Sequence, residues 1–118
     1  EQPSFVNQGD KKFLDNLPDE ISELGHMLLS EVRKFFRGEL KYYTRSGKYV
    51  ETPDNFWTVR IQPRDKSLRI TVRGFPEFFN KSSNIEIKGD MSSYSAFKIF
   101  TMRQIPEAIA IIRQASSK

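Results

Sequence analysis

The 118-residue chain has no cysteine and one histidine, and these absences exclude several kinds of site. Without cysteine there is no disulfide framework, thiolate zinc site or cysteine nucleophile, which fits a reducing compartment such as the cytoplasm. The lone His26 cannot form a metal cluster of recognisable spacing, and a histidine-based acid–base scheme would also need a nucleophile and an orienting carboxylate. Glu23, three positions earlier, could pair with it, so we interpret His26 as a structural or surface residue.

Long apolar runs and glycine-rich motifs are also missing. No apolar run approaches the ~20 residues that a membrane-spanning helix needs, and the first residues lack the pattern of a signal peptide. Gly47, Gly74 and Gly89 are isolated, so there is no phosphate-binding glycine loop. We expect a globular cytoplasmic protein with no membrane partner. Because the chain begins with Glu1 and not with Met, we also expect a segment of a longer protein whose other domains are its partners.

Catalytic patterns are weak. Glu86-Ile87-Lys88 has the E-x-K form found in metal-dependent nucleases, and Asp54 or Asp65 is a conceivable upstream acid. Such a site needs two carboxylates and a lysine that converge on one metal, and three-residue patterns of this kind also occur by chance. We therefore expect no enzyme, with no catalytic residue, no metal and no other cofactor.

The chain is organised around two alternating runs between Phe56 and Arg73. Apolar and polar residues alternate in both, and Pro63-Arg64-Asp65-Lys66 between them has the chemistry of a turn. Period-two alternation with one apolar face predicts a half-buried antiparallel pair. The predicted inner face consists of Trp57, Val59, Ile61, Leu68, Ile70 and Val72.

The other elements follow from periodicity. Residues 1–12 are polar and predict a tail or linker, and residues 13–118 predict a single domain. A stripe at helical spacing predicts a first helix that ends at Gly38, and a second stripe predicts a closing helix over Gln104–Ser116. Further strands are predicted at 40–45, at 49–51 and at 94–102, and the alternation of Ile85 and Ile87 in the segment NIEIKGD allows a short one there. The first stripe consists of Ile21, Leu24, Leu28, Val32 and Phe35.

This order of elements predicts an α+β fold. We expect an antiparallel sheet of four to five strands, with the N-terminal and the C-terminal helix packed on one face and the other face open. One core is expected to contain Ile21, Leu24, Leu28, Val32, Val59, Ile61, Leu68, Ile70, Val72, Ile105, Ile109 and Ile112.

The open face is the candidate functional surface. The net charge is +4, and between Lys41 and Arg73 eight bases stand against three acids. Neither alternating run places an acid on its polar face, so this charge asymmetry suits an anionic partner and predicts a non-enzymatic module that binds DNA or RNA. The alternative is a face that carries Lys and Arg only for solubility. The candidate nucleic-acid-binding residues are Arg45, Arg60, Arg64, Lys66, Arg69 and Arg73.

Aromatic residues interleave with these bases, and they allow two interpretations. Exposed aromatic rings and guanidinium groups can stack on bases, which is typical of a nucleic-acid-binding sheet. Alternatively the rings lie in the core and only the bases face water. The residues concerned are Tyr42, Tyr43, Tyr49, Phe56 and Trp57.

The segment after the second run contains three phenylalanines in five positions, Phe75, Phe78 and Phe79. One interpretation is a loop folded over one end of the core. The other is an exposed apolar patch that docks a protein partner, which would make the chain a protein–protein interaction module.

Two segments resemble a known family. They are Leu68-Arg69-Ile70-Thr71-Val72 and, after a loop, Phe97-Lys98-Ile99 with a closing helix over 105–115. The chain from about Asp15 to Ser116 resembles a small family of uncharacterised bacterial domains with the order helix, antiparallel sheet, helix. Its members are often found behind nuclease or restriction-type modules, and some carry the label "predicted transport protein". The resemblance implies an accessory domain of a DNA-acting or defence protein, and it assigns no functional residue.

Overall fold

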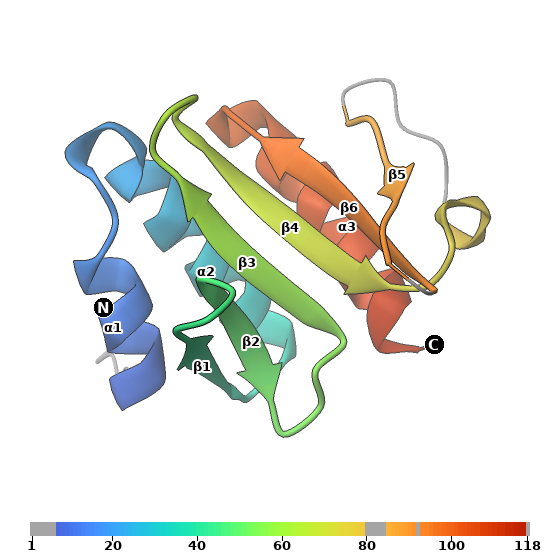
Figure 1. Cartoon of the computed structure of the whole chain (residues 1–118), viewed down its shortest axis with the longest axis horizontal. Coiled ribbons are helices and arrows are strands. Elements are labelled where there is room, and N and C mark those ends of the chain that lie inside the picture. The colour runs from blue at the N-terminus through green and yellow to red at the C-terminus, as the bar shows by residue number, and fades with distance from the viewer. Residues whose placement is uncertain (1–6, 80–84, 92, 118) are drawn as a thin grey trace.

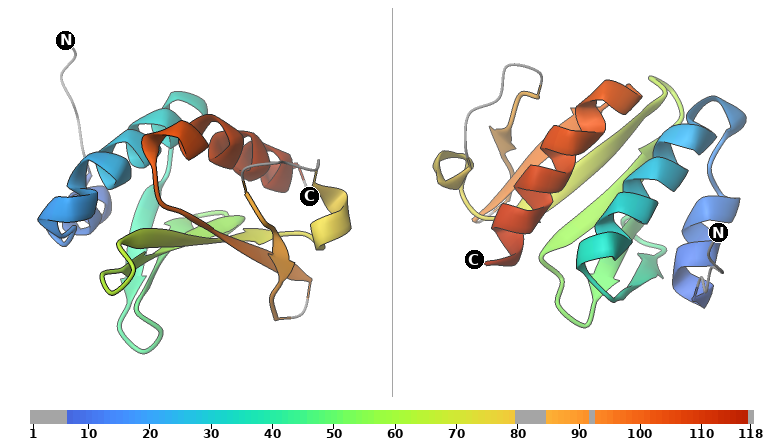
Figure 2. Two further views of the ribbon diagram at one scale, coloured as in Figure 1. Left: turned by 90° about the horizontal axis from the view of Figure 1, so that it is seen from above. Right: turned by 180° about the vertical axis from the view of Figure 1, so that it is seen from behind.

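The computed structural model describes residues 7–79, 85–91 and 93–117, which form a two-layer α+β fold. One layer is a six-stranded antiparallel sheet and the other consists of helices on one of its faces (Figures 1 and 2). Figure 1 looks onto the open face, with the helices behind it. The predicted fold class and the packing of both terminal helices on one face are confirmed.

The sheet has the strand order β1-β2-β3-β4-β6-β5. The predicted count of four to five strands is one short of the six observed, and the shortest strand, β5, has only two residues. It begins just after Ile85 and Ile87, the residues that suggested a strand there. The strands are β1 (Glu39–Tyr43), β2 (Lys48–Thr52), β3 (Trp57–Gln62), β4 (Ser67–Arg73), β5 (Lys88–Gly89) and β6 (Tyr94–Ile99).

The helices lie side by side across the back of the sheet (Figure 2, right). The predicted first helix is α2 (Ser22–Phe35), preceded by the 3-10 turn η1 (Asp19–Ile21). The closing helix is α3 (Ile105–Ser116), preceded by η3 (Met102–Gln104). A further 3-10 turn, η2 (Pro76–Phe78), follows β4.

The sequence did not predict helix α1 (Gln8–Asp15), which lies against β1 at one edge of the sheet (Figure 1). The interpretation of residues 1–12 as a tail is therefore wrong for Gln8 to Lys12, while residues 1–6 lie outside the described part. The side chain of Asn7 caps α1 by accepting a hydrogen bond from the backbone N–H of Asp10 at 2.8 Å.

The predicted core is confirmed almost completely. Val59 lies opposite Ile70 and Arg60 opposite Arg69, so the register of the central pair is the expected one. Of the predicted core residues only Ile61 is partly exposed. The last residue of the first stripe, Phe35, is 47% exposed and lies under the guanidinium of Arg113, because it faces a groove between α2 and α3.

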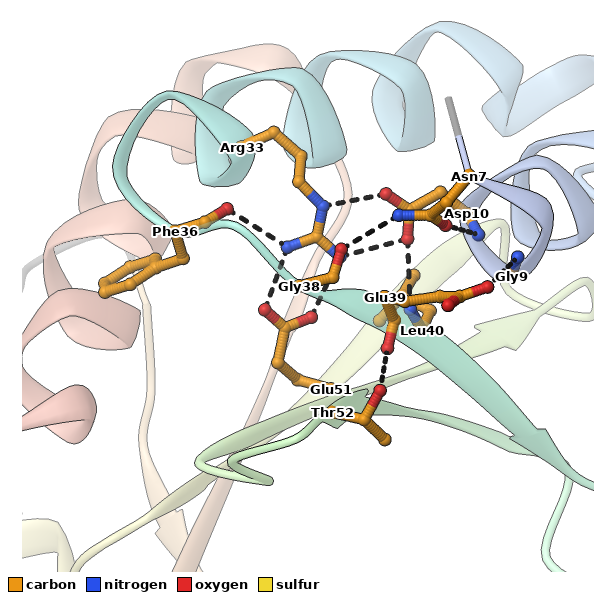
Figure 3. A network of polar contacts seen from close by, with 10 residues as sticks. All are labelled: Asn7, Gly9, Asp10, Arg33, Phe36, Gly38, Glu39, Leu40, Glu51 and Thr52. Carbon is orange, nitrogen blue, oxygen red and sulfur yellow. Dashed lines mark hydrogen bonds and ion pairs between the residues drawn. The ribbon is translucent and has the colours of Figure 1, made fainter. Parts of the chain in front are cut away.

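A buried ion network joins the helical layer to the β1–β2 hairpin (Figure 3). Arg33 of α2 donates hydrogen bonds from Nε and Nη2 to Asp10 of α1, at 2.7 and 3.0 Å. It donates two more, from Nη1 and Nη2, to Glu51 of β2 at 2.8 and 2.9 Å. Asp10 also accepts a hydrogen bond from the backbone N–H of Leu40 in β1 at 3.0 Å. One guanidinium thus connects two helices to the hairpin.

The charge state of Arg33 is fixed by these partners. Burial by itself lowers the pKa of the guanidinium, but the hydrogen bonds that it donates to Asp10 and Glu51 outweigh this effect and raise the pKa above its ordinary value. The tight packing around the network explains Gly38, since a Cβ there would collide with the Glu51 carboxylate.

Candidate nucleic-acid interface

Four cationic side chains lie in one line across the open face of the sheet. The register pairs Arg60 of β3 with Arg69 of β4, and Arg69 with Lys98 of β6. Val50 is paired with Thr58 and Tyr49 with Val59, so the same antiparallel register brings Lys48 of β2 next to Arg60. We call Lys48, Arg60, Arg69 and Lys98 the cationic row. With strands ~4.8 Å apart, the row is about 14 Å long.

The turns at both sides of the sheet extend beyond this face. Figure 2 (left) shows the β1–β2 turn and the β5–β6 turn on the side away from the helices. The β1–β2 turn carries the exposed Arg45 and approaches the row, since a Cβ at Gly47 would lie 3.8 Å from Nε of Arg60. The row therefore lies between two projecting turns.

The six predicted binding residues do not form one cluster. Arg64 and Lys66 are exposed in the β3–β4 turn, and Arg73 lies at the opposite end of β4, about 20 Å away along the strand. Arg60 and Arg69 are adjacent in the middle. The structure brings the central pair together with two lysines that the sequence analysis did not select, Lys48 and Lys98. Alternation did not single out either lysine, because Val50 and Ala96 share their outward phase and Glu51 and Ser95 lie on the inward one.

Carboxylates from outside the strands reach the open face, and here the sequence analysis needs correction. Asp54, from the loop before β3, binds Arg73 with both oxygens at 2.9 and 3.3 Å. The β3–β4 turn contributes Asp65, which pairs with Lys98 at 2.6 Å. The prediction of a face without acids was based on residues within the two strands alone. It missed acids in loops that lie close to the strands only in the folded structure.

Arg69 has a weaker partner. Its Nη2 lies 3.8 Å from a carboxylate oxygen of Asp90, which follows β5, too far for a direct hydrogen bond. Arg60 and Lys48 make no ion pair within the described residues. The cationic row thus contains one firmly paired cation, one loosely paired cation and two without a carboxylate partner.

Arg73 and Asp65 have shifted pKa values. A hydrogen bond to Asp54 raises the pKa of Arg73, which burial only partly offsets. The hydrogen bonds that Asp65 accepts from Lys98 and then from Ser67 lower the pKa of its carboxyl group. Because both carboxylate oxygens of Asp54 hold the Arg73 guanidinium, we interpret Arg73 as structural and not as part of a binding surface.

Most of the interleaved aromatics belong to the core. Trp57, Phe56 and Tyr49 are buried, and Tyr42 packs on Tyr49 with ring centroids 4.7 Å apart. The core interpretation therefore holds for these four, since large rings on the inward phase contribute the most buried apolar area. Tyr43 is the exception, with 46% exposure and a position opposite Lys48.

A second exposed ring stands near the other end of the row. Phe100 is 50% exposed and follows Lys98 by two positions, just beyond β6. Tyr43 and Phe100 thus stand near the two ends of the cationic row.

Of the three phenylalanines after β4, one covers the core and two are exposed. Phe79 is 5% exposed and packs edge-on against Phe78, with centroids 5.2 Å apart. Phe75 and Phe78 are 53% and 36% exposed. Only Phe79 therefore covers the core, and the docking interpretation is wrong for that residue.

Other candidate chemistry finds little support in the described residues. They contain no group of three or more His, Asp or Glu side chains placed to hold a metal ion. His26 is exposed, and its Nδ1 lies 2.8 Å from the backbone carbonyl of Ser22. None of the described helices combines the length and the apolar character needed to cross a bilayer.

Comparison with family models, curated proteins and solved structures found no match for this chain. The resemblance to an accessory domain beside nuclease modules therefore stays a prediction.

Proposed function

We propose that this domain is a non-enzymatic module that binds the phosphate backbone of a nucleic acid across the cationic row. The observation that carries the proposal is the direct cross-strand pairing of Arg60 with Arg69. Like charges opposite each other destabilise a sheet, and Arg60 has no carboxylate among the described residues to offset the repulsion. An anion bound between the two guanidiniums would relieve it.

The shape of the row favours a polymer over a small anion. Its cations extend for about 14 Å across four strands, so a chain of phosphates engages several of them at once. Each neutralised phosphate releases condensed counterions, which gives a polynucleotide an affinity that an isolated phosphate lacks. Lys48, Arg60 and Arg69 are the residues we expect to bind, with Arg45 on the adjoining turn as a further contact.

The test is a titration of single-stranded and double-stranded DNA and RNA at several salt concentrations. With three to five phosphates neutralised, log affinity falls with log salt at a slope of roughly −2 to −5. A variant with Lys48→Ser and Arg60→Ser should flatten that slope by about 2. The matched control replaces Lys11 and Lys34 on the helical layer with Ser, which changes the net charge equally.

Two results would refute the proposal. The first is that the unmodified chain binds none of the four nucleic acids at low salt. The second is that the Lys48 and Arg60 variant binds as tightly as the Lys11 and Lys34 control. Thermal melting of both variants checks that the fold is retained.

The exposure of Phe75 and Phe78 favours a second candidate, a protein–protein contact at the end of β4. Under this alternative, Phe75→Ser weakens self-association or partner binding and leaves nucleic-acid binding unchanged. Sedimentation velocity on the variant and on the unmodified chain tests for self-association.

A further inference from the structure

The outer edge of β6 is only partly covered. β5 pairs Lys88 with Ala96 and Gly89 with Ser95, and in the described residues no strand covers the edge beyond Ala96. A pocket of about 430 Å³ opens at this place. It is lined by residues of β4, β5 and β6 and by the segments that flank them.

Three cations converge on this pocket. Arg69 and Lys98 come from the cationic row, and Lys88 lies on the same face because it is the cross-strand neighbour of Ala96. The small side chain of Ala96 lies between them and leaves space above the sheet. The pocket is thus continuous with the proposed phosphate-binding line.

An exposed aromatic ring completes the lining. Phe100 borders the pocket and is half exposed, so part of its ring is accessible to a ligand in the pocket. Aromatic side chains beside a basic groove are the usual platform on which an unpaired base stacks. A base inside a duplex has no free face to offer.

We propose that this pocket holds one unpaired nucleotide, with its base stacked on Phe100 and its phosphate bound by Lys88 and Arg69. The inference rests on the proposed function and adds to it that the domain prefers single-stranded over double-stranded nucleic acid.

The one carboxylate in the lining, Glu86, indicates which base fits. A carboxylate accepts hydrogen bonds and donates none, so it pairs with the amino group of cytosine and not with the carbonyl oxygen that thymine presents at the same position. The pocket therefore favours an amino-bearing base, whose amino group is a donor that thymine lacks at this position. This role also accounts for an acid among three cations.

The experiment measures binding of a single-stranded cytidine tract, a thymidine tract and a duplex to the full chain. Phe100→Ala should weaken binding of the cytidine tract about tenfold, leave duplex binding unchanged and leave the salt slope unchanged, because stacking involves no counterion. The matched control is Phe35→Ala, which removes a ring of similar exposure from the helical layer. Phe100→Trp should restore binding, which a purely structural role would not explain.

The outcomes separate this inference from the proposed function. If Phe100→Ala binds the cytidine tract like Phe35→Ala while the Lys48 and Arg60 variant loses binding, the pocket assignment is overturned and the nucleic-acid function stands. If the Lys48 and Arg60 variant binds as tightly as the unmodified chain, the proposed function itself is overturned. Equal affinity for cytidine and thymidine tracts, unchanged in Glu86→Gln, refutes the selection of an amino-bearing base.

Discussion

Replacing Arg33 with methionine should be among the most destabilising single changes in this chain. The side chain makes four hydrogen bonds to the Asp10 and Glu51 carboxylates. Those two carboxylate side chains are 4% and 3% exposed, so water cannot replace the lost donors. Removing one partner from a buried ion pair costs ~3–5 kcal/mol, because it leaves an uncompensated charge in the interior.

This loss is large relative to the whole stability of a domain of this size, which is about 5–15 kcal/mol. It corresponds to a fall in melting temperature of about 10 °C or more. Urea denaturation gives the free energy directly, and the midpoint should fall while the slope m stays unchanged, since the folded state buries a similar area.

Two further variants make the reasoning refutable. Arg113→Met removes an exposed arginine that stacks on a phenylalanine ring at 4.1 Å, and it should cost less than ~1 kcal/mol. Adding Asp10→Asn and Glu51→Gln to Arg33→Met removes the buried charges and should recover much of the loss. If Arg33→Met costs no more than Arg113→Met, the network does not hold the layers together.

Three further predictions concern backbone crowding at Gly38, the pH dependence of stability through Tyr49, and the phenylalanine-rich segment. Gly38→Ala should destabilise the chain, because its Cβ collides with the Glu51 carboxylate; urea denaturation measures the loss. Burial raises the pKa of Tyr49, so its contribution to stability is complete below the ordinary tyrosine pKa of ~10 and disappears as pH rises through the raised value. As pH rises into the alkaline range, the free energy of unfolding should therefore fall less for Tyr49→Phe than for the unmodified chain. An equal fall would contradict this. Phe79→Ser should lower the melting temperature by exposing core area, whereas Phe75→Ser should hardly change it.

Regular alternation made much of the sheet predictable from sequence. Val59 and Ile70 share a face because side chains alternate with period two, and their register followed from a tight turn. The burial of Trp57 was implied by the same phase. Helix α1 was not predictable in this way, because one of its two buried residues is Asp10, and the burial of Asp10 depends on Arg33, 23 positions later.

The candidate site was predictable only in part for the same physical reason. Arg60 and Arg69 were recognised because they stand within regular strands. Their electrostatic surroundings were not, since Asp54 and Asp90 come from irregular segments whose positions no periodicity specifies. A pattern along one strand identifies which residues point outward, but partners from loops decide which of them carry free charge.

The Arg33 network has a consequence for mapping this surface by mutation. Strand β2 presents Glu51 to the helices and Lys48 to the open face, so the network that fixes one side of the strand also orients the other. A screen for loss of binding should therefore recover positions in α1 and α2 that touch no ligand. Such variants would fail through a misdirected hairpin, and a scan restricted to exposed residues would overlook them.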